Sequence, residues 1–266
     1  MDISSGARAT LAVLSAVIVG ILFFGVVMGA AVALVTLNTR LSPEFAWFPL
    51  PVTLILAAAI WFAERRWGIG LARRDAANLP TSRVWAIATA ITLAGVAACA
   101  FNGYFTGYVR ATELLDAPVD RTFQRTYAFY VSVLAAILAE ISFRGIMQTR
   151  MQAALGLWPV VIIIGIVNVL GHRWGPEITQ NGFGLFVVLA GWTYLRAVSQ
   201  SLWPPLIMHA VTNLVIAGWL WNVGPIRHAE MPPAVVILLA VAIAGGISVS
   251  LALARGSRAR RPEVVA

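Results

Sequence analysis

The sequence has 266 residues, of which 60% are hydrophobic and 11% are charged, and its formal net charge is +8. Soluble domains carry about 25% charged residues, so this composition, with a mean hydropathy of +0.84, excludes an ordinary soluble protein and predicts a single integral membrane domain over residues 1–266. All 19 basic residues are arginines, and most of them lie in short connections between apolar runs. This indicates contact with lipid headgroups and gives no indication of a nucleic-acid partner.

Apolar segments that approach the length of a membrane span occur about eight times along the chain. A spanning helix needs about 20 apolar residues, and the shorter segments are the weaker candidates. We therefore predict an all-α fold, a polytopic transmembrane helix bundle of about eight spans. In chain order these predicted helices cover residues 10–37, 46–63, 83–104, 127–149, 157–172, 182–199, 203–221 and 233–254.

The arginines favour one side of the predicted membrane. With eight spans, the basic connection around Arg65–Arg83 and the tail from Arg255 fall on the same side as Arg150 and Arg196. The positive-inside rule makes this side cytoplasmic. We expect a multi-pass protein of the cell membrane with both termini in the cytoplasm, and the alanine-rich, lysine-free composition suggests a bacterial source.

Two ionisable residues interrupt the apolar run "AEISFRG". Glu140 and Arg144 are four residues apart, so they share one helix face, and a charged residue near the centre of a span costs about 2.5–3.5 kcal/mol on insertion scales. Three explanations are open at this point: a structural ion pair, an Arg144 side chain that reaches the membrane interface, or a functional site.

Polar residues at the same spacing recur in two later segments. "NVLGH" places His172 four residues after Asn168, and "HAVTN" places Asn213 four residues after His209. Each pair alone is also explained by hydrogen bonds between helices or by contact with headgroups.

The predicted hairpin between the fourth and fifth spans brings two of these groups to one depth. Glu140 lies about as far before the turn near Leu155 as His172 lies after it, roughly 23 Å at 1.5 Å per residue. His209 follows the interfacial start of its own helix. We therefore predict one cavity, open toward the cytoplasmic half of the membrane, that holds Glu140, His172, His209 and Asn213, with Arg144 in support.

Such a group of side chains favours hydrolysis. A carboxylate and a histidine can hold and deprotonate a water molecule, while a second histidine and an amide can stabilise an oxyanion. We expect no metal or other cofactor, although a zinc ion bound by His172 and His209 is an alternative.

With these three motifs the chain resembles the CPBP intramembrane protease family, also called the CAAX protease and bacteriocin-processing (Abi) family, over a core of about residues 127–214. The family pattern is EExxxRG, FxxxH and HxxxN or HxxxD, which here reads "AEISFRG", "NVLGH" and "HAVTN". The resemblance implies a glutamate-dependent endopeptidase in which His172 activates water, and His209 and Asn213 stabilise the oxyanion. It aligns the first glutamate with Ala139, so Glu140 would have to act as the base.

The departure at Ala139 leaves two readings of the function. The first is an active intramembrane endopeptidase that cuts a membrane-anchored or hydrophobic peptide or protein. The second is a pseudoprotease that binds membrane peptides as a regulator or an immunity protein. A transporter would predict inverted repeats and interrupted helices, which the sequence does not display.

Overall fold

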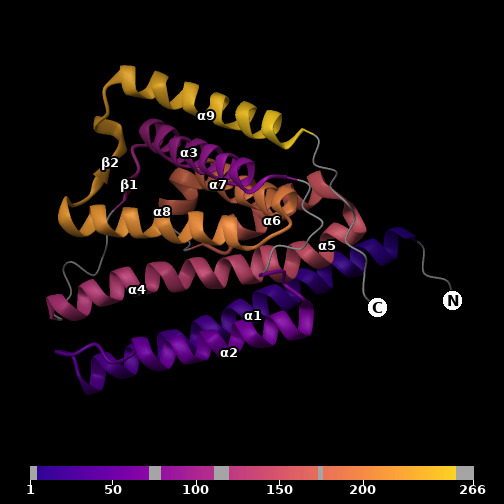
Figure 1. The fold of residues 1–266 in the computed structure, drawn as a ribbon. Helices are drawn as coiled ribbons and strands as arrows, with labels where there is room; N and C mark the ends of the chain where they lie inside the picture. Colours follow the sequence, from indigo (N-terminus) through magenta and orange to yellow (C-terminus); the bar gives the residue numbers. More distant parts are fainter. Residues whose placement is uncertain (1–4, 72–78, 111–119, 173–175, 256–266) are drawn as a thin grey trace.

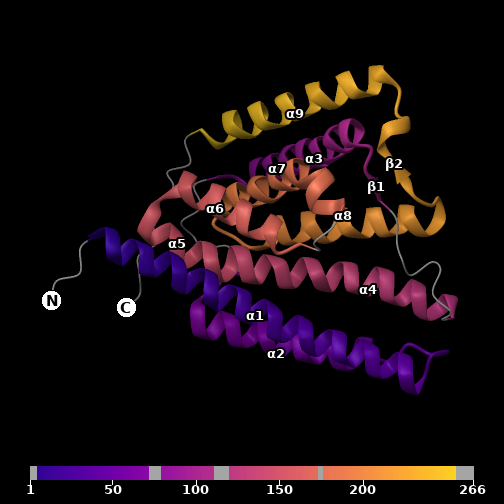
Figure 2. The ribbon, with the colours of Figure 1, turned by 180° about the vertical axis from the view of Figure 1, so that it is seen from behind.

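The computed structural model describes residues 5–71, 79–110, 120–172 and 176–255. Most of these residues form helices packed into one bundle, with a short two-stranded ribbon at one end (Figures 1 and 2). The predicted all-α polytopic helix bundle is confirmed. Its elements are α1 (Ser5–Leu41), α2 (Pro49–Trp67), α3 (Thr81–Thr106), β1 (Val109–Arg110), α4 (Arg121–Ala139), η2 (Glu140–Met147), α5 (Gln148–Leu155), α6 (Leu157–Leu170), α7 (Pro176–Ser199), α8 (Trp203–Asn222), β2 (Ile226–Arg227), η3 (His228–Glu230) and α9 (Pro233–Ala254).

Each apolar segment identified in the sequence forms a helix, although the helices differ in their suitability as spans. Among the described residues, five helical stretches are long and apolar enough to cross a membrane: α1, α3, the continuous α4–η2–α5, α7 and α9. Helix α6 has 14 residues and is shorter. Helix α2 ends in a charged turn and α8 carries the polar residues His209 and Asn213, so neither is among the five long apolar stretches. The number of eight spans therefore stays a prediction.

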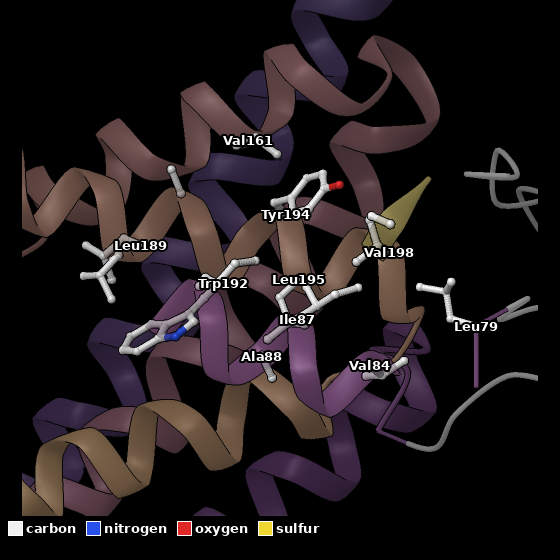
Figure 3. Close-up of a cluster of buried hydrophobic side chains, with 14 of the residues drawn as sticks. Leu79, Val84, Ile87, Ala88, Val161, Leu189, Trp192, Tyr194, Leu195 and Val198 are labelled. Carbon is white, nitrogen blue, oxygen red and sulfur yellow. The ribbon is translucent and has the colours of Figure 1, made fainter. Parts of the chain in front are cut away.

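Helix α3 lies in the upper part of the bundle, packed on α7 and on α9, while α8 packs along α4 and α1 lies against α2 and the η2–α5 segment (Figure 1). The largest apolar core joins α3 and α7, and Figure 3 shows its side chains, with Ile87 and Ala88 on one helix and Leu189, Trp192 and Leu195 on the other. Dispersion between closely packed side chains holds such helix pairs together in lipid, where burial from water is not the driving force.

The α5–α6 hairpin turns where the sequence predicts. Helix α5 ends at Leu155, and Gly156 has a positive φ of 78°, which glycine adopts without a steric penalty. This turn lies at the same end of the bundle as the start of α1 and the end of α9 (Figures 1 and 2). Because the start of α1 and the end of α9 lie at the same end of the bundle, the chain crosses it an even number of times. Arg73, Arg74 and the arginines of the tail after Arg255 lie outside the described residues.

The segment between α8 and α9 corrects one expectation. The sequence "PIRHAEMPP" predicts a loop in which His228 is solvated, but its side chain is buried. Strand β2 pairs with β1 and so holds the segment against the end of α3, where the His228 ring stacks on Tyr108 at 5.9 Å and packs on Gly103. The pairing of two strands from distant parts of the chain is not visible in the local sequence.

Candidate active site

The carboxylate and the arginine of "AEISFRG" lie on a π-helical segment. Residues Glu140–Met147 form η2, between α4 and α5, and all eight residues are buried. A π-helical turn has i to i+5 hydrogen bonds, is rare, and occurs frequently at functional sites. The backbone thus becomes irregular directly after Ala139, where the sequence departs from the family pattern.

Glu140 is the centre of a buried polar cluster. Its Oε1 accepts a hydrogen bond from Arg144 Nη1 at 2.7 Å and contacts His209 Nδ1 at 2.8 Å. Glu140 and Arg144 have no exposed side-chain surface. The other carboxylate oxygen, Oε2, has no hydrogen-bond partner among the described residues. The cluster therefore joins the first and third sequence motifs by direct contact.

Arg144 is held on several sides. Its Nη2 donates to the carbonyl oxygen of Leu189 at 2.8 Å, and its guanidinium lies 5.7 Å from the Trp192 ring. With the Asn168 amide oriented so that its oxygen faces the guanidinium, that oxygen accepts from both Nη1 and Nη2 at 3.2 Å. The alternative in which Arg144 extends to the membrane interface is wrong, because this side chain is fully buried.

The His209 ring is fixed by an aromatic neighbour. Trp192 of α7 stacks on it with ring centres 4.4 Å apart and an interplanar angle of 30°. The indole is itself fixed, since Trp192 Nε1 donates to Thr92 Oγ1 of α3 at 3.0 Å. The α3–α7 core therefore determines where the imidazole lies.

His172 connects to the cluster through Asn168. It follows the end of α6, is partly buried, and its Nδ1 lies 2.9 Å from the Asn168 carbonyl oxygen. Asn168 thus contacts Arg144 with its side chain and His172 with its backbone carbonyl oxygen. Asn168 occupies the position that the FxxxH pattern gives to phenylalanine, and its role is an addition to the predicted site.

Asn213 lies one helical turn beyond His209 on α8. Its Nδ2 donates to the Ser132 carbonyl oxygen of α4 at 3.0 Å, so this amide joins α8 to α4 and does not contact Glu140 in this state. The structure therefore brings Glu140, Arg144 and His209 together directly. The shared cavity of His172, His209 and Asn213 stays a prediction.

Two features of this site were not predicted from the sequence. Trp192 lies in an ordinary apolar run, and no pattern in that run marks it as a neighbour of His209. Asn168 was noted only as a polar partner of His172. The spacing of Asn168 from His172 was a usable signal, because a polar side chain inside an apolar helix needs a partner. In the described ranges no three side chains of His, Cys, Asp or Glu form a metal-binding group, and zinc at His172 and His209 remains untested.

Comparison with known families supports the resemblance seen in the motifs. Residues 122–215 match the family model described as type II CAAX prenyl endopeptidase Rce1-like. The match covers about a third of the chain and includes all three motifs, so the resemblance to the CPBP and CAAX protease family is confirmed over this part. Neither the curated proteins nor the solved structures gave a match.

Proposed function

We propose that this chain is an intramembrane endopeptidase that hydrolyses a peptide bond in a membrane-anchored or hydrophobic peptide or protein. The observation that carries the proposal is the buried contact between Glu140 Oε1 and His209 Nδ1 at 2.8 Å, within the segment that matches a protease family. A carboxylate in contact with an imidazole is a common arrangement for water activation. The hydrolytic centre would consist of Glu140, His172, His209 and Asn213, with Arg144 in support.

The place of the reaction follows from the bundle. Glu140 lies on η2, His209 and Asn213 lie on α8, and His172 follows α6. The neighbouring helices are long and apolar enough to lie in a bilayer. The substrate would therefore reach the site within the membrane. We propose the bacterial cell membrane as the location. Both termini would lie in the cytoplasm, because the arginine-rich connections lie on the same side as the termini and such connections favour the cytoplasmic side.

A pseudoprotease is the second candidate, and one observation favours it. Glu140 Oε1 is shared by Arg144 and His209, as in a structural ion pair, while Ala139 supplies no carboxylate. In this alternative the site binds a membrane peptide without cleavage, as a regulator or an immunity protein.

The experiment that separates the two candidates uses purified protein in lipid vesicles with a panel of membrane-anchored peptides. Cleavage is followed by mass spectrometry for wild type, His172→Ala and His209→Ala. The matched control is His228→Phe, because His228 is the one other histidine of the chain and contacts Tyr108 at the end of α3. Cleavage by wild type and by the control, together with its loss in both alanine variants, supports the protease. Peptide binding without cleavage supports the pseudoprotease.

A further inference from the structure

The two histidines of the site share one feature: each forms its hydrogen bond through Nδ1. For His172 the partner is the Asn168 carbonyl oxygen at 2.9 Å, and a backbone carbonyl can only accept a hydrogen bond. The proton must therefore be on His172 Nδ1. In the neutral ring, Nε2 then carries the free lone pair.

The same tautomer follows for His209. Its partner is Glu140 Oε1, which also accepts from Arg144. A fully buried guanidinium needs a counter-charge, and among the described residues Glu140 is the carboxylate that contacts it. An ionised carboxylate accepts hydrogen bonds and cannot donate them, so His209 Nδ1 donates and Nε2 is the acceptor.

We propose that His209 Nε2 is the general base of this protein, and that Glu140 and Arg144 are positioning residues that hold its tautomer and its orientation. This inference rests on the proposed endopeptidase function, and it gives the base role to His209 in place of Glu140. The resemblance gives His209 to the oxyanion and gives the base role to a carboxylate. Here Ala139 lacks that carboxylate, and a neutral ring with hydrogen on Nδ1 has no N–H left on Nε2 to donate to an oxyanion.

The structure also argues against Glu140 as the base. Protonation of its carboxylate would leave the buried Arg144 charge without its counter-ion, and an uncompensated buried charge is strongly unfavourable. Transfer of a proton to His209 Nε2 instead keeps the Glu140 carboxylate ionised, so the carboxylate faces both the Arg144 guanidinium and the resulting imidazolium. Trp192, stacked on the ring at 4.4 Å, adds a favourable contact with the cationic form.

The reaction balances with water as the sole co-reactant. His209 Nε2 takes one proton from water as the water oxygen bonds to the scissile carbonyl carbon. The carbon–nitrogen bond then breaks with its electron pair on nitrogen, and the proton on Nε2 passes to that leaving amine. The products are a carboxylic acid and an amine, and His209 returns to its neutral form.

The first test measures the tautomers directly and does not depend on activity. The chain has three histidines, so ¹⁵N-histidine labelling gives three imidazole spin systems, which His172→Gln and His228→Phe assign. At a pH where the rings are neutral, the nitrogen shifts should show the proton on Nδ1 for both His172 and His209. A proton on Nε2 of His209 would overturn the inference.

A variant of the positioning residues provides the matched comparison. The double change Glu140→Leu with Arg144→Leu removes both charges together, so it leaves no unpaired ion. His209 should then lose its Nδ1 preference and show a mixture of tautomers, while His172 keeps its own. An unchanged His209 tautomer in this variant would mean that Glu140 does not set it.

The second test is kinetic and separates this inference from the proposed function. If wild type cleaves a membrane-anchored peptide, His209→Gln should lower kcat by about 10²–10⁴-fold, the usual contribution of a general base, with a smaller change in KM. Cleavage by wild type that survives in His209→Gln contradicts the base role and leaves the endopeptidase in place. A wild type that cleaves nothing contradicts both, whatever the tautomers are.

Discussion

Ala139 and Glu140 are consecutive in the chain, but their side chains enter different surroundings. Ala139 packs in an apolar cluster with Ala16 of α1 and with Val160 of α6, whereas Glu140 points to His209 of α8. The position that the family pattern gives to its first glutamate therefore lies in an apolar cluster shared by α1, η2, α5 and α6. The Glu140 carboxylate lies against His209 and outside the apolar cluster that contains Ala139.

Replacement of Ala139 by glutamate tests what the missing carboxylate does. A carboxyl group placed on the α6 side would lie toward His172, so Ala139→Glu should raise the rate of peptide cleavage, or start it if the wild type is inert. It should also lower the thermal midpoint, because overpacking a buried apolar position typically costs about 1–3 kcal/mol and a buried charge adds to this.

The matched control is Ala139→Gln, which has a similar volume and no charge. The glutamate variant should be more active than the glutamine variant at equal amounts of folded protein. Onset of cleavage only with glutamate would identify the wild type as a pseudoprotease. Equal rates in the two variants would show that a carboxylate at this position has no catalytic role.

The Glu140–Arg144 pair should show strong energetic coupling. Removal of one partner from a buried ion pair costs about 3–5 kcal/mol, because the other charge stays buried without compensation. Glu140→Leu and Arg144→Leu alone should therefore each destabilise the protein strongly. The double variant should be more stable than either single variant, measured by thermal unfolding in the same detergent. Additive losses would mean that the pair is not a coupled unit.

The polar groups of the site were predictable from the sequence, because each one interrupts an apolar helix. Glu140, Arg144 and His209 were expected to lie together, and they are in contact. Asn213 was expected beside them, but its amide binds the Ser132 carbonyl oxygen. Depth along a helix follows from counting residues, while the direction of a side chain depends on helix rotation and on the π-helical turn of η2.

Tertiary contacts account for the remaining differences. Trp192 and Leu189 reach Arg144 from α7, and the positions of these two residues follow from close α3–α7 packing that composition does not encode. The burial of His228 depends on the pairing of β1 with β2, two-residue strands that lie far apart in the sequence. Short strands of this kind have no periodicity to detect.

Close packing between α3 and α7 provides a test of the fold with a control on the same helix. A Cβ atom at Gly184 would lie 2.5 Å from the Cys99 backbone, whereas a Cβ at Gly182 meets nothing within 4 Å. Gly184→Ala should destabilise the protein by about 1–3 kcal/mol through overpacking. Gly182→Ala should be neutral or slightly stabilising, because alanine favours the helix over glycine. Thermal unfolding of both variants checks this, and equal midpoints would contradict the α3–α7 contact.

The orientation in the membrane is tested by reporter fusions after Arg74, which lies outside the described residues, and after Arg255. Both should report the cytoplasm, because the arginine-rich connections favour that side and the end of α9 lies at the same end of the bundle as the end of α2 (Figures 1 and 2). A periplasmic signal from either fusion would overturn the proposed topology.

His228 should make the stability of the β1–β2 end depend on pH. Burial, and to a smaller extent the positive charge of Arg110, lower the pKa of His228 below its ordinary value of about 6.5. The folded protein therefore binds a proton at His228 less readily than the unfolded chain does. Stability is complete above about pH 6.5 and decreases as the pH falls from there toward the folded-state pKa, because the unfolded chain takes up more protons in that range.

The measurement is the thermal midpoint of wild type and of His228→Phe between pH 7.5 and pH 5, values that lie roughly 1 unit above and 1.5 units below the ordinary histidine pKa. Phenylalanine keeps a ring that can stack on Tyr108, and it does not titrate. The midpoint of wild type should fall more steeply with acidification than that of His228→Phe, and the difference between the two curves isolates His228 from His172 and His209. Parallel curves would mean that His228 is protonated equally well in the folded and unfolded chains, and that the ring is not held against Gly103 and Tyr108 as the structure shows.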